Sequence, residues 1–80
     1  MKSTKDYIST DPEVLGGQVV FKGTRVPVES LFDHVEKGGT IDEFLEDFPS
    51  VSRNQAVGVM EIAAKFISSK QFLKLDEILA

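Results

Sequence analysis

The strongest constraint on the fold comes from residues 40–64, where two helical patterns meet across a short break. The first pattern places apolar side chains at i, i+3, i+4 and i+7, which is one face of a helix: Ile41, Phe44, Leu45 and Phe48. The second continues at helical spacing through Ala56, Val59, Met60, Ala63 and Ile67. Pro49 separates them, because proline lacks an amide donor and disfavours helical backbone in the residue before it. The stretch predicts a helix-turn-helix.

Each of these two helices begins with the pattern of a capping box, in which two residues three apart satisfy each other's free amides. Thr40 pairs with Glu43 in the first helix, and Ser52 pairs with Gln55 in the second. Two helices with such well-marked starts, joined by so short a turn, are expected to pack at a large angle.

A further helix is expected ahead of this pair. Pro27 suits the first helical position, and the following residues supply an apolar stripe at i, i+3, i+4 and i+7: Val28, Leu31, Phe32 and Val35. Gly38 and Gly39 then provide a left-handed stop. The sequence therefore predicts a three-helix unit over residues 28–66.

The N-terminal part predicts little regular structure. Residues 1–10 are polar except for Tyr7 and Ile8, so we expect a flexible start whose order depends on those two side chains reaching the core. Residues 18–26 predict a small hairpin, because two β-prone runs flank Lys22 and Gly23. An isolated hairpin is marginal in water, so it should pack on helices or pair with a second copy of the chain.

The last helix of the unit is apolar around much of its circumference, as expected for a central or interfacial helix. Gly58 in its interior costs about 1 kcal/mol relative to alanine, which is explained either by close approach of another backbone or by neutral drift. Residues 70–80 follow as an amphipathic helical tail with three apolar anchors: Phe72, Leu75 and Leu79. They can bind a groove on a partner, or close the core or a dimer of the chain itself.

Composition narrows the functional classes. The chain has 80 residues and a net charge of -4, which argues against a broadly basic nucleic-acid-binding surface. A single domain near this size buries only about 60% of the surface of its unfolded chain, so stabilisation by a partner chain is plausible. The absence of cysteine excludes disulfides, thiolate zinc sites and a cysteine nucleophile. No segment resembles a signal peptide or membrane helix, so a soluble cytoplasmic protein is expected.

Candidate nucleic-acid-reading residues lie at the start of the last helix, where a recognition helix contacts base edges. Arginine suits guanine, and asparagine and glutamine suit adenine, while a serine and free amides can hold a phosphate. The candidates are Ser52, Arg53, Asn54 and Gln55. In the alternative interpretation Ser52 and Gln55 only cap the helix, and the other two are solvated. Lys22 and Arg25 can add positive charge in a dimer, or serve as a turn residue and an ion-pair donor.

Catalysis has little support. His34 is the single histidine, and beside Asp33 on a helix surface it is more typical of a solvated side chain than of a ligand or base. The adjacent carboxylates of residues 42–47 are typical of a solvated acidic face. No glycine pattern matches a phosphate-binding loop. We therefore expect a non-enzyme with no metal, cofactor or small-molecule substrate.

The run from Ile8 to about Ala64 resembles the small bacterial proteins grouped as domain of unknown function 433. The similarity is carried by Asp11-Pro12, Gly16-Gly17, the run from Lys22 to Val28 and the break at Phe48-Pro49. Its motif residues are Gly17, Lys22, Gly23, Thr24, Arg25, Pro27 and Pro49. The resemblance implies a homeodomain-like fold and a VapB-like antitoxin encoded beside a PIN-like ribonuclease toxin.

The expected fold is thus mainly α: a small N-terminal β-hairpin, a three-helix homeodomain-like helix-turn-helix unit and a C-terminal amphipathic tail, in a single domain of residues 1–80. The expected function is that of a homodimeric antitoxin that neutralises a PIN-like ribonuclease and binds its own promoter DNA. The alternatives are a protein-interaction module that never touches DNA and a stand-alone transcriptional regulator.

Overall fold

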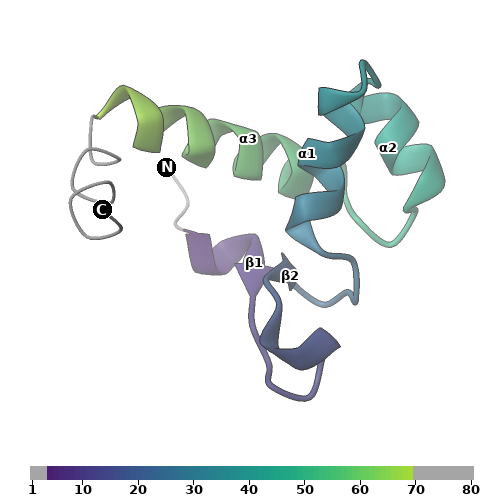
Figure 1. The fold of residues 1–80 in the computed structure, drawn as a ribbon, viewed down its shortest axis with the longest axis vertical. Helices are drawn as coiled ribbons and strands as arrows, with labels where there is room; N and C mark the ends of the chain where they lie inside the picture. The colour runs from purple at the N-terminus through teal and green to yellow at the C-terminus, as the bar shows by residue number, and fades with distance from the viewer. Residues whose placement is uncertain (1–3, 70–80) are drawn as a thin grey trace.

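The computed structural model describes residues 4–69, which form three helices and a small sheet (Figure 1). The helices are α1 (Val28–Glu36), α2 (Ile41–Asp47) and α3 (Arg53–Ser68). The sheet pairs β1 (Ile8–Ser9) with β2 (Val20–Phe21), and two 3-10 turns, η1 (Thr4–Asp6) and η2 (Leu15–Gly17), precede the strands. The prediction of a mainly helical chain with a small N-terminal two-stranded unit is confirmed. The predicted tail at 70–80, with Phe72, Leu75 and Leu79, lies outside the described residues.

The strand pairing differs from the predicted hairpin over residues 18–26. β2 pairs antiparallel with β1, so that Ile8 lies opposite Phe21 and Ser9 opposite Val20. The expected return run at 24–26 forms no strand. Instead, Pro27 and Val20 form an isolated antiparallel bridge. Thr24 closes the turn: its hydroxyl donates to the Phe21 carbonyl at 2.8 Å and accepts from the Val26 amide at 3.0 Å. The Phe21 amide then donates to the Val26 carbonyl at 3.0 Å, so the chain returns beside β2 without forming a regular strand.

The start of the chain is more ordered than the sequence predicts for residues 1–10. From Thr4 onward the backbone forms η1 and β1, and the Lys22 amide donates to the Tyr7 carbonyl at 2.8 Å. Tyr7 and Ile8, the two apolar residues of this segment, pack against the core. Their burial supplies the free energy that orders an otherwise polar segment.

The core lies where β2 and all three helices meet. Its buried residues are Val20, Phe21, Leu31, Phe44, Val51, Ala56 and Val59. Phe44 is at its centre, with ring centroids 5.9 Å from Phe21 and 4.8 Å from Phe48. The predicted apolar stripes of the helices thus supply the core, and β2 adds two residues to it.

The connections between helices follow the predicted signals. Pro27 lies one residue before α1, as its N-cap, and the chain leaves α1 through Gly38, which has a positive φ of 89°. Pro49 follows the C-cap of α2 at Phe48, and Val51 is buried in the turn before α3. The three-helix unit predicted for 28–66 therefore has the expected limits, except that α3 continues to Ser68.

Beyond Met60, α3 extends past the core and its apolar stripe becomes accessible (Figure 1). Phe66 is 39% exposed and Ile67 is 57% exposed. These two side chains continue the buried stripe of Ala56 and Val59 along the same helix. α3 therefore has a packed N-terminal half and a C-terminal half that presents apolar surface.

Candidate interaction site

The start of α3 carries a complete capping box. The Ser52 hydroxyl accepts from the Gln55 amide at 3.1 Å, and the Gln55 side-chain oxygen accepts from the Ser52 amide at 3.0 Å. α2 begins differently, because Thr40 caps the Glu43 amide at 3.1 Å but its hydroxyl also donates to the Glu43 carboxylate at 3.2 Å. The second capping box predicted from the sequence is therefore present in full, and the first only in its Thr40 half.

Gln55 has a structural role besides the cap. Its side-chain nitrogen donates to the Lys22 carbonyl at 2.8 Å, which ties α3 to the turn after β2. Both the oxygen and the nitrogen of the Gln55 side-chain amide are thus hydrogen-bonded within the chain, and the side chain is half-buried. Of the four residues predicted to read DNA, Ser52 and Gln55 serve the capping that the sequence offered as the alternative interpretation.

Arg53 forms an ion pair with Asp42, across the junction of α2 and α3. The two side chains are 59% and 71% exposed, so water screens the pair and its contribution to stability is small. Asn54 is exposed on the next position of the helix. Arg53 and Asn54 are therefore accessible at the surface, with Arg53 already facing a carboxylate.

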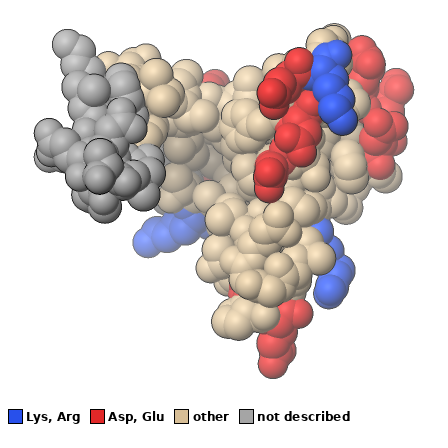
Figure 2. Space-filling view, in the orientation of Figure 1, with Lys and Arg blue, Asp and Glu red and all other residues tan. Residues whose placement is uncertain are grey.

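The surface beside these residues is acidic. Figure 2 shows red side chains gathered over α1 and α2. Seven exposed carboxylates lie on the two helices: Glu29, Asp33, Glu36, Asp42, Glu43, Glu46 and Asp47. Lys37 follows α1 between them. These seven residues define the acidic face of residues 4–69.

The motif residues of the N-terminal part shape turns. Gly17 and Gly23 have positive φ values of 89° and 77°, which glycine adopts without strain. Lys22 contributes its backbone to contacts with Tyr7 and Gln55, and its side chain is exposed, as is that of Arg25. Pro27 and Pro49 stand at helix ends. Within the described residues these motif positions therefore form the scaffold of the fold.

His34 lies at the end of α1 and is partly covered. Its ring packs edge-on against Phe44 with centroids 6.0 Å apart, and its Nε2 is buried with no hydrogen-bond partner. The ring fills space left by Gly39, whose missing Cβ would overlap it. The expectation of a solvated side chain is wrong, because Phe44 and Gly39 draw the ring into the structure. Across residues 4–69, no group of three or more His, Asp or Glu side chains is placed to hold a metal ion.

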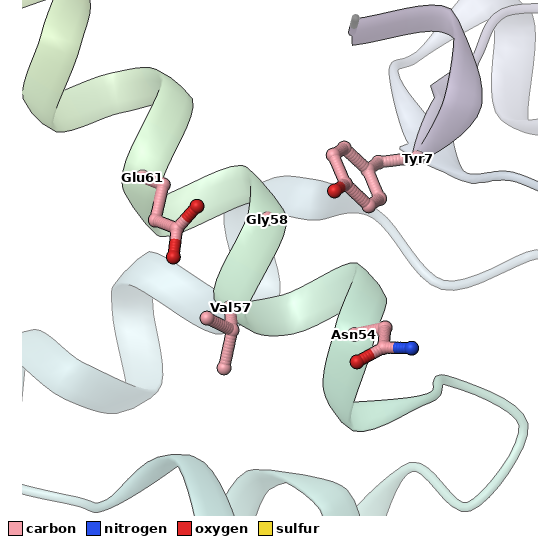
Figure 3. Close-up of a pocket in the computed structure, with 5 residues that line it drawn as sticks. All are labelled: Tyr7, Asn54, Val57, Gly58 and Glu61. Atoms are coloured by element: carbon pink, nitrogen blue, oxygen red, sulfur yellow. The ribbon is translucent and has the colours of Figure 1, made fainter. Parts of the chain in front are cut away.

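A shallow cavity of about 260 Å³ lies between α3 and Tyr7 (Figure 3). It is lined by Tyr7, Asn54, Val57, Gly58 and Glu61. The Tyr7 ring rests on Gly58: a Cβ there would lie 2.6 Å from two of its ring carbons. The close approach expected at Gly58 is therefore present, and the atoms nearest to it belong to an aromatic ring and not to a backbone. Tyr7 and Glu61 were missed as site residues, since only the folded chain brings them together.

The sequence matches the family described as protein of unknown function DUF433 over residues 8–63. The chain belongs to the DUF433 family. The family region takes in β1, β2, α1, α2 and most of α3, so it coincides with the core and with all but Tyr7 of the cavity lining. The last turn of α3, with Phe66 and Ile67, follows it.

A similar protein is uncharacterized protein y4eO of Sinorhizobium fredii, which is 33% identical over 51 residues. That match covers 64% of this chain and 23% of the relative, so the chain spans about a quarter of that longer protein. No solved structure matches the chain. Within residues 4–69, no helix is long and apolar enough to cross a membrane.

Proposed function

We propose that this DUF433 protein is an antitoxin that binds and neutralises a PIN-like ribonuclease. The observation that supports the proposal is the acidic face, where seven exposed carboxylates lie on two adjacent helices. A ribonuclease binds a polyanion, so the channel that holds its substrate must carry positive charge. An acidic protein of complementary shape competes for that channel and associates rapidly with it.

The proposed fold of the unit is a homeodomain-like helix-turn-helix, in which α2 and α3 form the pair and α1 supports them. The antitoxin is proposed to act in the cytoplasm as a homodimer. The accessible apolar end of α3 supports self-association, because apolar side chains such as Phe66 and Ile67 favour burial against another chain. The anchors proposed from the sequence for the toxin groove are Phe72, Leu75 and Leu79.

The acidic face can be tested with one charge reversal on α2. Glu46→Lys is expected to raise the concentration needed for half-inhibition of the ribonuclease in the neighbouring reading frame by roughly tenfold, because the new lysine repels the positively charged toxin surface that the carboxylate attracts. RNA cleavage is measured against concentration of the full-length chain, at low and at physiological salt.

Glu13→Lys is the matched control, since it makes the same charge change at an exposed position before η2. It should leave inhibition nearly unchanged. Equal effects of Glu46→Lys and Glu13→Lys would show that net charge acts without a defined surface. Absence of inhibition by the unmodified chain would refute the antitoxin proposal.

Promoter binding is the second candidate, supported by the accessible Arg53 and Asn54 at the start of α3. Arg53→Ala is expected to weaken specific binding of the upstream DNA fragment by about 1–3 kcal/mol, the size of a lost arginine contact to guanine. Asp42→Asn should strengthen binding, because it frees Arg53 from its ion pair and removes a charge that repels phosphate. Fluorescence anisotropy over a salt series measures both.

Opposite effects of these two substitutions on DNA affinity would support promoter binding. If the unmodified chain shows no salt-dependent affinity for the fragment, the protein-interaction alternative remains. The acidic face then acts on protein partners alone.

A further inference from the structure

We propose that the cavity between Tyr7 and α3 is a binding site for an arginine side chain of a partner protein. The cavity combines an aromatic ring, a carboxylate, a side-chain amide and a small apolar floor. None of the seven residues of the acidic face lines the cavity, whose lining comes from Tyr7 and α3 (Figure 3). This inference rests on the proposed function in one respect, that a partner protein binds the chain and supplies the arginine.

The ring of Tyr7 forms one wall of the site because α3 has no side chain at Gly58. A Cβ at that position would lie 2.6 Å from Tyr7 Cε1 and Cε2, so glycine lets the ring settle against the helix backbone. The backbone of Tyr7 itself is held in place by the hydrogen bond that the Lys22 amide donates to the Tyr7 carbonyl. The ring is therefore attached to the sheet and placed beside α3 before any ligand arrives.

Glu61 supplies the negative charge. Its side chain is exposed, lines the cavity, and makes no hydrogen bond or ion pair with another residue of the range 4–69. Side chains on a helix lean toward its N-terminus, so the carboxylate is carried over the floor at Val57 and Gly58. Figure 3 shows it on the side of the cavity opposite Tyr7. A cation between the two would meet a carboxylate and an aromatic ring together.

Asn54 marks the other end of the floor. It lies seven positions before Glu61, about 10 Å along the axis at 1.5 Å per residue, and its amide has no partner among the described residues. That length accommodates an extended arginine side chain together with the partner backbone that carries it, with the aliphatic part over Val57 and the head group at Glu61. Asn54 is then placed to hydrogen-bond the backbone of the partner.

Arginine suits this set of groups better than lysine. Its planar guanidinium stacks on an aromatic ring and donates two parallel hydrogen bonds to one carboxylate, whereas an ammonium group is compact and strongly hydrated. The volume of about 260 Å³ is small for a cofactor site but sufficient for one long side chain. The carboxylate of Glu61 disfavours an anion such as a phosphate.

The test titrates the full chain with N-acetyl-arginine amide and follows backbone and aromatic NMR signals. We expect saturable shifts at Tyr7, Asn54, Gly58 and Glu61. Glu61→Gln should weaken binding about tenfold, since a hydrogen bond to a charged group contributes about 1.4 kcal/mol or more. Tyr7→Leu, which keeps an apolar group over Gly58, should weaken it as well. Thermal unfolding followed by circular dichroism confirms that each variant is folded.

Two controls make the outcome decisive. Glu13→Gln removes the same charge from an exposed position before η2, outside both surfaces, and should leave the affinity unchanged. N-acetyl-citrulline amide, which is uncharged, should not bind. The proposal is overturned if the two glutamine variants behave alike, if citrulline binds as well as arginine, or if no saturable shifts occur at these residues. Ribonuclease inhibition is measured separately, so failure of the arginine site and failure of the antitoxin proposal are distinguishable.

Discussion

Replacing Phe44 with alanine is expected to lower the free energy of unfolding by about 3–5 kcal/mol, the largest effect of any single substitution considered. The side chain is 0% exposed and contacts three rings: Phe21, His34 and Phe48. Truncation leaves a cavity that these rings border. A domain of this size has a total stability of roughly 4–12 kcal/mol, so the variant loses a large part of it.

Phe32→Ala is the matched control for Phe44→Ala. Phe32 lies on α1 and is 36% exposed, so its removal should cost about 1–2 kcal/mol, clearly less than the loss of Phe44. Urea unfolding followed by far-ultraviolet circular dichroism measures both variants. Similar midpoints for the two would mean that Phe44 is not the centre of the core.

Replacing Gly39 with alanine is expected to destabilise the protein by about 1–3 kcal/mol, the range for overpacking a filled site. The new Cβ would overlap the His34 ring and lie 2.9 Å from the His34 carbonyl oxygen. The same carbonyl accepts the Gly39 amide at 3.0 Å, which holds the two residues together. Gly39 does not have a positive φ, so the penalty arises from the collision and not from the backbone conformation.

A double-mutant cycle separates these terms. With His34→Ala present, Gly39→Ala should cost less, because the overlap with the ring is gone, but it should remain destabilising, because the His34 carbonyl oxygen still lies 2.9 Å from the new Cβ. Urea unfolding of the four proteins measures the coupling. A stabilising effect of Gly39→Ala in the unmodified chain would show that the His34 ring is free to move away.

The helices could be predicted well because the signals that define them are local. The capping of α3 by Ser52 and Gln55 involves residues three apart, and the break at Pro49 follows from the chemistry of one residue. The apolar stripe that contains Phe44 follows from helical spacing. For the same reason Phe44 was predicted to be buried, although nothing in its spacing identifies Phe21 and His34 as its neighbours.

The site residues were less predictable because their partners are distant in sequence. The ion pair of Arg53 with Asp42 and the hydrogen bond from Gln55 to Lys22 join residues far apart in the chain. These two contacts determine which of the residues predicted to read DNA are still available to a ligand. Sequence patterns list chemically suitable side chains, but they do not show which of them the fold has already engaged.

The small sheet illustrates the same limit. The β-prone run at Val20 and Phe21 was identified, but its nearest run in sequence is not its main partner. Strand partners are selected by which pairing buries more apolar surface, and pairing with β1 brings Tyr7 and Ile8 onto the core. That choice also places the Tyr7 ring beside Gly58 and so forms the cavity proposed to bind arginine.

For residues 40–64 the sequence alone determined two capped helices, the break between them and the faces that each must bury, because these depend on neighbours within about one helical turn. Tertiary structure decided what those faces meet. It placed Arg53 against Asp42, bound Gln55 to the Lys22 carbonyl and set Tyr7 on Gly58. These contacts follow from the packing of the whole chain around Phe44, which no local pattern specifies.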